Sequence, residues 1–425
     1  MRGMTSRKVK PKSVGRRSER QPEPCEPERR PELFENEWRR EASEREQHQD
    51  ANELEQQPLS SGQDQVHVSS EQDTASDEEM LDSSHPEARE LFDLAIKFKA
   101  LAPWRWLEET DVFGVESPDT GELGFVSIMG TLGEHQAMAL YLGAEGLYAF
   151  DDLRNDAAGP AENVTQIRHL QAAFSDREFL WKEDRKLIKQ MGLKFRGPNA
   201  WPMFRSYRPG YLPWLVTVEE GRFLIHALSQ TLDFATRLRD EENPIRPTGR
   251  VEKGGHLVLA ARKVGQGLVW EGQVRVVPRP KREAILGSIA GDLIDELKGA
   301  AHSELELEVD LQIAPARIGP AGTRPKALYL AMVADRASGF LFGMEAMTAE
   351  DSLASMRAQL PRVVARTLLQ HGIIPARMIV RSDSMRQLMR GFTQGLNIEL
   401  VQEDELPSID EAAEGIREFM RDGSI

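Results

Sequence analysis

Apolar residues follow helical spacings from about Ser84 onward, but they are sparse before it. Leu91 and Phe98 lie on one stripe of a predicted helix, which Pro103 ends. Residues 1–83, in contrast, are rich in Glu, Gln, Arg, Ser and Pro. A segment of that composition buries too little apolar surface to offset the entropy of ordering. We therefore predict a disordered tail over 1–83, and truncation at Ser84 is expected to leave the melting temperature nearly unchanged.

Residues 84–242 combine strand and helix patterns. Apolar positions alternate on both sides of a turn over 111–130, which predicts a hairpin. Further strands are expected over 136–143 and 168–176, and an amphipathic helix that begins near Thr217 closes the unit. The pattern predicts an α+β domain.

Residues 250–425 alternate strands and helices, which predicts an α/β domain with a mixed sheet. From 327 onward the order is β-β-α-β-α-β-α. This is the order of a ribonuclease-H-like sheet lacking one hairpin strand, and a doubly wound mixed sheet gives it too. Whether 250–320 and 327–425 form one sheet or two subunits stays open from the pattern alone.

The stretch "GPNAWPMFRSYRPGYLPWL", residues 197–215, is dense in aromatic side chains and arginines. Its prolines lack the N–H that a sheet ladder needs, so they exclude a central strand. We predict an extended, looping segment that carries aromatic side chains on both sides.

Two interpretations of 197–215 are open. Aromatic and arginine side chains together bind peptides or single-stranded nucleic acid, and the candidate binding residues are Arg205, Tyr207, Arg208 and Tyr211. The structural interpretation is favoured, because so many aromatic rings are not all exposed in a soluble monomer. It expects Trp201 and Trp214 to be buried and Arg208 to be exposed.

Two carboxylates are candidates for chemistry. Asp335 ends a predicted strand, and Asp383 ends another. If the strands are parallel neighbours, both carboxylates would lie at one sheet edge and could hold Mg²⁺ for phosphodiester cleavage. The competing interpretation makes Asp335 a hairpin-loop residue and Asp383 a helix-start residue. A third acid is hard to place, so no metal or cofactor is assigned.

Composition narrows the class of protein. The chain of 425 residues has a formal net charge of −15, which opposes approach to nucleic acid and favours a protein or peptide partner. Cys25 is the only cysteine, so neither a disulfide within the chain nor a cysteine metal cluster can form. No apolar run reaches the length of a membrane span. We expect a cytoplasmic protein that does not enter a membrane.

Several segments carry a family resemblance. They are "FKALAPWRW" (98–106), "FGVESPDTGELG" (113–124), "GLKFRGPNAWPMFRSYRPGYLPW" (192–214) and "EEGRFL" (219–224). They resemble an uncharacterised bacterial family of proteins of unknown function. The stretches "PARMIVRSD" and "LNIELVQEDELPSIDEA" resemble the second domain of unknown function that usually follows. The resemblance implies a two-domain arrangement and bacterial origin, and it implies no activity.

These observations favour a non-catalytic recognition or adaptor protein that uses the segment 197–215. The alternative is a metal-dependent nuclease-like enzyme with Asp335 and Asp383.

Overall fold

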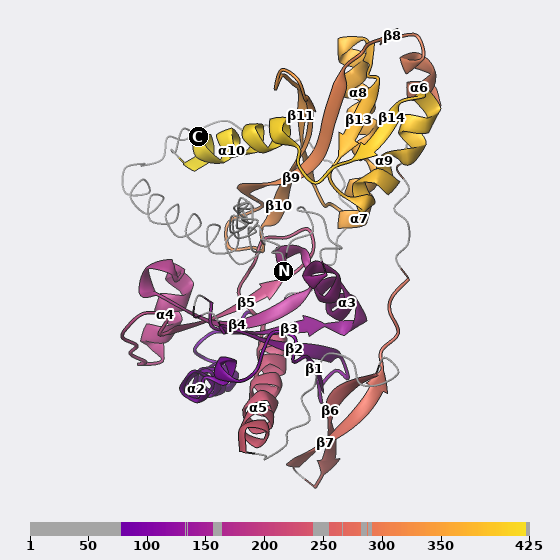
Figure 1. Ribbon diagram of the computed structural model, residues 1–425. Helices are drawn as coiled ribbons and strands as arrows, with labels where there is room; N and C mark the ends of the chain where they lie inside the picture. The colour runs from indigo at the N-terminus through magenta and orange to yellow at the C-terminus, as the bar shows by residue number, and fades with distance from the viewer. Residues whose placement is uncertain are drawn as a thin grey trace, which may run out of the picture.

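The computed structural model describes residues 78–131, 133, 135–155, 164–240, 255–265, 267–281, 287 and 291–421. Two domains, each built around its own sheet, follow one another along the chain (Figure 1). The first 77 residues of the predicted tail lie outside the described part.

The first domain contains a seven-stranded sheet with the order β5-β4-β3-β2-β1-β6-β7. Neighbouring strands are antiparallel except β1 and β6, which are parallel. The strands are β1 (Phe113–Glu116), β2 (Leu123–Met129), β3 (Ala137–Leu142), β4 (His169–Ser175), β5 (Trp201–Tyr207), β6 (Gly255–Val264) and β7 (Gly267–Val276).

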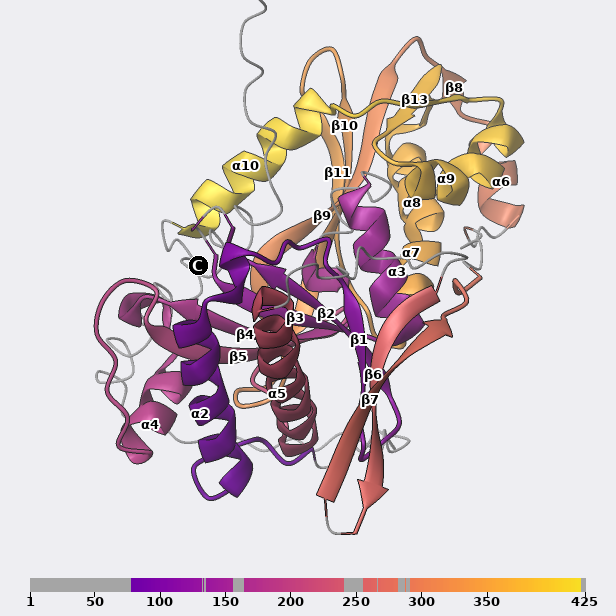
Figure 2. The ribbon, with the colours of Figure 1, turned by 60° about the horizontal axis from the view of Figure 1, so that its bottom comes forward.

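Helices cover both faces of this sheet. They are α2 (Pro86–Leu101), α3 (Gly143–Arg154), α4 (Lys182–Gln190) and α5 (Val218–Asp240). Helices α2 and α5 lie side by side on one face, and α3 lies on the other (Figures 1 and 2). Strands β3 and β4 are buried along their whole length, since both of their faces are covered.

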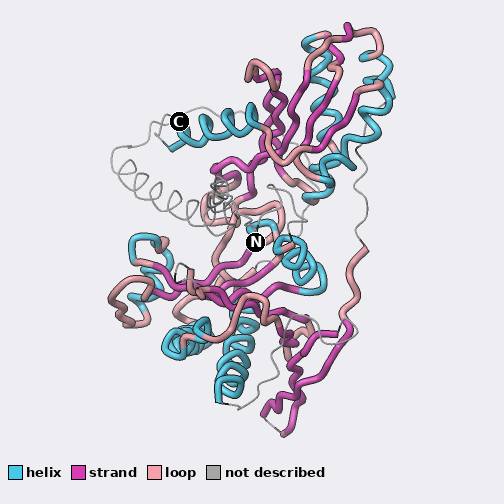
Figure 3. Tube along the Cα trace, in the orientation of Figure 1, coloured by secondary structure: helices cyan, strands magenta, loops and turns pink. Residues whose placement is uncertain are grey.

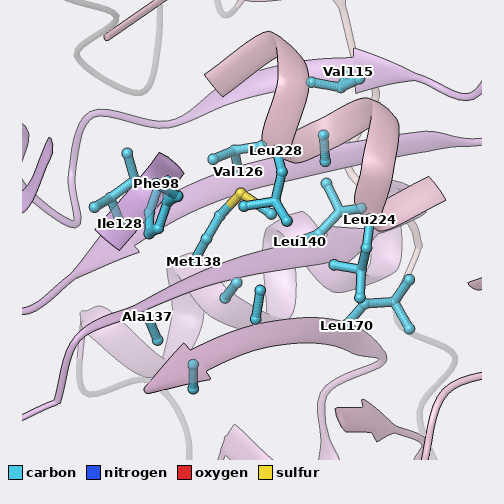
Figure 4. Close-up of a cluster of buried hydrophobic side chains, with 14 of the residues drawn as sticks. Phe98, Val115, Val126, Ile128, Ala137, Met138, Leu140, Leu170, Leu224 and Leu228 are labelled. Atoms are coloured by element: carbon cyan, nitrogen blue, oxygen red, sulfur yellow. The ribbon is translucent and has the colours of Figure 1, made fainter. Parts of the chain in front are cut away.

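The core of the first domain forms where α2 and α5 meet the central strands. Phe98, Leu224 and Leu228 from the helices pack with Met138 and Leu140 of β3 (Figure 4). The apolar stripes predicted for the two helices are therefore the surfaces that bury the sheet, and the α+β prediction is confirmed.

The hairpin β6–β7 belongs to the first domain, although the sequence pattern assigned it to the second. Gly114 and Val115 of β1 lie in register with Val258 and Leu259 of β6. This pairing joins strands about 140 residues apart, so no local pattern announces it. The hairpin therefore extends the first sheet beyond the expected boundary between 242 and 250.

The folded part begins earlier than predicted. Residues 78–83 were assigned to the tail, but the N–H of Leu81 donates to the carbonyl of Val216 at 3.1 Å. The N–H of Val218 donates to the carbonyl of Glu79 at 2.8 Å. Leu81 also packs beside Gly221 of α5. Residues 78–83 show no periodicity of apolar side chains that would predict a helix or a strand. They nevertheless bind to the start of α5, and we call them the strap.

The strap should contribute measurably to the stability of the first domain. A chain that starts at Ser84 should be about 1–2 kcal/mol less stable than one that starts at Glu78, because it loses backbone hydrogen bonds and the half-buried Leu81. For a domain of this size the melting temperature should fall by several degrees, as measured by calorimetry. Equal melting temperatures for the two truncations would contradict a docked strap.

The second domain contains a five-stranded sheet with the order β11-β10-β9-β13-β14. Strands β9, β10 and β11 pair with one another in antiparallel fashion, and β13 and β14 run parallel to β9. The strands are β9 (Glu306–Ile318), β10 (Lys326–Asp335), β11 (Leu341–Thr348), β13 (Arg377–Val380) and β14 (Glu399–Gln402), with β8 (Ala301–His302) and β12 (Ile373–Ile374) paired separately.

Strand β9 completes the element order predicted from 327 onward. It pairs with β10 along its length, so it is the hairpin strand that the ribonuclease-H-like order lacked. Residues 250–320 are therefore divided between the two domains: β6 and β7 belong to the first sheet, whereas β9 shares the second sheet with β10.

Helices enclose the second sheet unequally. They are α6 (Gly291–Leu297), α7 (Leu353–Ala358), α8 (Leu360–His371), α9 (Asp383–Leu396) and α10 (Pro407–Arg421). Helices α6, α8 and α9 build the larger core on one face of the sheet. On the other face, α10 contributes Ile409 to the smaller core, in which Leu406 is also buried. The tube view shows α10 on the opposite side of the sheet from α8 and α9 (Figure 3).

Candidate functional site

The aromatic–arginine segment is part of a sheet, not a loop. Residues 201–207 form β5, which pairs with β4 from Trp201 opposite Ser175 to Tyr207 opposite His169. Strand β5 is the outermost strand of its sheet, where Pro202 costs little because one side of the strand needs no ladder. The prolines exclude a central strand, as predicted, but they permit this edge strand.

Arg205 is buried and is not available to a ligand. Its guanidinium donates to both carboxylate oxygens of Asp184 on α4, at 2.9 and 2.5 Å. The guanidinium also lies 3.9 Å from the ring centre of Trp181. Only 3% of the side chain is exposed. The sequence prediction that Arg205 binds a partner was wrong, because this arginine ties α4 to the sheet.

Tyr207 is buried as well. Its ring stacks on His169 with the ring centres 4.0 Å apart, and its hydroxyl lies 3.3 Å from Oε1 of Gln171. Only 1% of Tyr207 is exposed, so it contributes to packing and not to a binding surface. The rings of Trp201 and Trp214 are half-buried, less enclosed than the sequence suggested.

Arg208 lies in a charge cluster at the end of β5. It donates to both carboxylate oxygens of Glu78, at 2.7 and 3.0 Å, and to Glu220 at 2.9 Å. Arg324 of the second domain joins the cluster and donates to the carbonyl and the hydroxyl of Ser206. Burial lowers the pKa of Arg324 to about 10, and the positive charge of Arg208 acts in the same direction. The guanidinium of Arg208 is half-buried and already bound by two carboxylates.

The end of the segment holds the two domains together. The N–H of Leu212 donates to the carbonyl of Pro325 at 3.0 Å, and the N–H of Ala327 donates to the carbonyl of Gly210 at 2.9 Å. Between these bonds, the half-buried Tyr211 forms a bridge with Lys326. Leu212 is buried in the core of the second domain. We call residues 208–214 with 324–327 the interdomain joint.

Gln166 also belongs to the joint. Its side-chain oxygen accepts hydrogen bonds from the N–H of Gly210 and from the hydroxyl of Tyr329 on β10. The aromatic segment 197–215 therefore forms an edge strand and a contact between the two domains. The favoured structural interpretation is supported, but the looping segment that it expected is an edge strand over 201–207.

Asp335 and Asp383 do not form a site. Strands β10 and β13 are not neighbours, because β9 lies between them, and two strand spacings amount to about 10 Å. The two strands also run in opposite directions, since β10 is antiparallel to β9 and β13 is parallel to it. The carboxylates therefore follow opposite ends of the sheet and cannot share one Mg²⁺.

Each of these acids has a local role. Asp335 is buried and accepts hydrogen bonds from the N–H and the hydroxyl of Ser338, which closes the hairpin loop. Asp383 is exposed in the first turn of α9, where hydrogen bonds from Arg386 lower the pKa of its carboxyl. The competing interpretation from sequence is the one that the geometry supports.

The sheet does carry buried acids, but on β9. Asp310 is paired with Arg381, whose Nε lies 3.1 Å from its carboxylate. Arg381 also donates to the carbonyl of Asp404 and to the carboxylate of Asp410 on α10. The guanidinium of Arg381 thus fills the space beside Asp310 at the carboxyl end of β13. It connects β9, β13 and α10.

Glu308, two residues earlier on β9, is fully buried. Its carboxylate accepts the N–H groups of Ser408 and Ile409 in the first turn of α10, at 3.0 and 3.1 Å. Burial raises the pKa of this carboxyl above its usual value. Together, Glu308 and Asp310 with Arg381 attach α10 to the sheet. Among the described residues, no group of three His, Cys, Asp or Glu side chains is placed to hold a metal ion.

An exposed aromatic group lies at the free edge of the second sheet. Phe340 is 56% exposed, and its ring contacts the ring of Phe342 edge-on at 5.0 Å. The ring of Phe342 contacts His371, at the end of α8, at 4.9 Å. We call Phe340, Phe342 and His371 the β11 aromatic cluster. Sequence reading missed it, because "GFLFG" resembles an ordinary hairpin strand.

Comparison with known proteins supports the division into two domains. Residues 89–252 match a model described as Domain of unknown function (DUF7309), and residues 293–417 match Domain of unknown function (DUF6930). These matches confirm the two-domain arrangement that the resemblance implied. No curated protein and no solved structure matches the chain. In the described part of the chain, no helix is both long and apolar enough to cross a membrane.

Proposed function

We propose that the protein is a non-catalytic recognition or adaptor protein that binds an extended protein segment at the edge strand β11. The observation that carries this proposal is the exposed β11 aromatic cluster beside the outer edge of β11, which is the last strand of its sheet in the described part of the chain. A non-catalytic recognition or adaptor protein is also the class expected from the sequence. The proposed contact surface is β11 and not the segment 197–215. The proposal also keeps the cytoplasmic location expected from the sequence.

A bulge in β11 creates the cluster. Val333 of β10 lies opposite Gly343, and the next residue, Ala334, lies opposite Leu341, so Phe342 is the extra residue. A bulge redirects side chains locally. Gly343 faces Thr367 of α8, and Phe342 packs against the same core. This arrangement supports Phe340 as an exposed ring on a fixed base.

The strand edge supplies the second half of the proposed contact. β11 is the last strand of its sheet, and Met344 to Ala346 are exposed along it. An extended segment can add to such an edge through main-chain hydrogen bonds, while side-chain contacts provide specificity. An exposed aromatic anchor beside the edge is the feature that dominates binding energy at many interfaces.

The proposal predicts the effect of Phe340→Ala. Linear peptides would be selected from a random phage-displayed library against the full chain, and their dissociation constants measured by fluorescence polarisation. Loss of a central aromatic anchor should weaken binding by about 30-fold, which corresponds to about 2 kcal/mol. Phe419→Ala is the matched control, because Phe419 is similarly exposed, at 53%, on α10, which covers the opposite face of the sheet from Phe342. It should leave binding unchanged.

Two results would count against the proposal. In the first, no peptide is enriched against the full chain. In the second, selected peptides bind Phe340→Ala and the parent chain equally well, which would place the contact elsewhere.

A further inference from the structure

The hairpin β6–β7 presents an unusual open edge. β7 is the outermost strand of the first sheet, and the hairpin extends beyond α5 at the lower right of Figure 2. Its apolar side chains are exposed: Val276 by 71%, Val274 by 59% and Val269 by 42%. Natural proteins normally protect such edges with charges, prolines or covering elements. The exposed apolar side chains of this edge strand therefore indicate a surface that another strand covers.

The two faces of β7 differ in character. The apolar face carries Leu268, Trp270, Val274 and Val276, with Gly272 between them. Trp270 is half-buried, and its ring lies 5.9 Å from the ring of His226 on α5. The opposite face carries Val269 together with the polar Glu271, Gln273 and Arg275. A strand that pairs with β7 must match both faces.

We propose that a second copy of this chain pairs with β7, in antiparallel fashion around Gln273, to form a symmetric dimer with a continuous fourteen-stranded sheet. Two-fold symmetry makes identical edge strands antiparallel. In this register Glu271 of each copy lies opposite Arg275 of the other, so two opposite-charge pairs form. Trp270 lies opposite Val276 of the second copy, and Gly272 lies opposite Val274.

Other symmetric registers are less favourable. Centring on Glu271 places two carboxylates opposite each other, and centring on Arg275 places two guanidinium groups opposite each other; like charges in those positions repel. Centring on Gly272 places Val269 opposite Arg275. A centre between two residues would set the apolar face of one copy against the polar face of the other. The sequence of β7 is thus self-complementary in the register around Gln273.

Of the two charges that this register uses, Glu271 is exposed and Arg275 is half-buried. Glu271 contacts Arg262 at 3.3 Å, but both side chains are mostly exposed, and such surface pairs contribute little and exchange readily. Arg275 contacts Glu116 at 2.6 Å through Nη2, and its Nη2 and Nε also lie beside the side-chain amide of Gln273. A guanidinium has five N–H donors, so Arg275 retains donors for a second carboxylate. This inference concerns a different strand from the proposed function, and either can fail without the other.

Reversing the charge of Glu271 or of Arg275 tests the proposed pairing across the two-fold axis. The full chain should show the mass of two chains in sedimentation equilibrium at tens of micromolar. Glu271→Arg places arginine opposite Arg275 of the second copy, and Arg275→Glu places glutamate opposite Glu271. Each variant alone should dissociate at least tenfold more readily than the parent. An equimolar mixture of the two should restore the dimer, because every pair across the axis is then complementary.

The mixture also separates loss of pairing from loss of folding, since a misfolded variant would not be restored by its counterpart. Lys263→Glu is the control, because Lys263 is exposed on β6 and does not lie on the free edge. It should leave the dimer mass unchanged. A monomeric mass for the parent chain at every concentration would overturn the proposal. So would a mixture that remains monomeric while both variants keep the parent's melting temperature.

Discussion

Asp184→Asn should lower the free energy of unfolding of the first domain by about 3–5 kcal/mol. The substitution keeps the volume of the side chain and an acceptor for the N–H of Trp181. It removes the negative charge that faces Arg205, whose guanidinium is buried against Trp181. A buried charge without its partner is strongly destabilising. Urea unfolding followed by tryptophan fluorescence measures the effect directly, because Trp181 lies in contact with the pair.

The compensating variant identifies the cause. Asp184→Asn combined with Arg205→Met removes both charges, and it should recover most of the lost stability. If the double variant is as unstable as the single one, the loss comes from packing around α4 and not from an unpaired arginine. A single variant with parent-like stability would mean that water solvates Arg205 when Asp184 is neutral.

Local patterns in the sequence predict a helix or strand well where apolar side chains recur at a single regular spacing. Leu224 and Leu228 lie on the stripe predicted for α5, and this stripe does cover the sheet. Patterns fail where a long-range partner decides the outcome. β5 carries prolines that suit a loop equally well, and its position at the sheet edge follows from pairing with β4. β6 joins the first domain through β1, which no residue of the hairpin reveals.

The same limit applies to the candidate sites. Glu308 and Asp310 alternate with Leu307 and Val309, a pattern typical of a strand with one solvated face. α10 covers that face, so the acids are buried and need Arg381 and the N–H groups of the helix. The sequence shows an amphipathic helix near the end of the chain, but it does not show which strand face the helix covers. The interdomain joint is hidden in the same way.

Arg381→Met should destabilise the second domain by about 3–5 kcal/mol. Asp310, which is buried, would keep hydrogen bonds from the N–H of Leu311 and the amide of Gln312 but lose its cation. The carbonyl of Asp404 would also lose a donor. The loss should appear first as faster hydrogen exchange in α10, because the cluster attaches that helix. Arg386→Met is the matched control: Arg386 forms an exposed pair with Asp383, so stability should change little.

Two further measurements decide what Asp310 is for. Asp310→Asn combined with Arg381→Met should recover most of the stability, since no unpaired charge remains. Under a nuclease-like role, the arginine would mask a carboxylate that binds metal, and millimolar Mg²⁺ should then stabilise Arg381→Met more than the parent chain. We expect no such difference, because the nearby Glu308 is already bound by the first turn of α10 and one free carboxylate is a poor Mg²⁺ site. A Mg²⁺-dependent rise in melting temperature confined to Arg381→Met would reverse this conclusion and assign the cluster to metal chemistry.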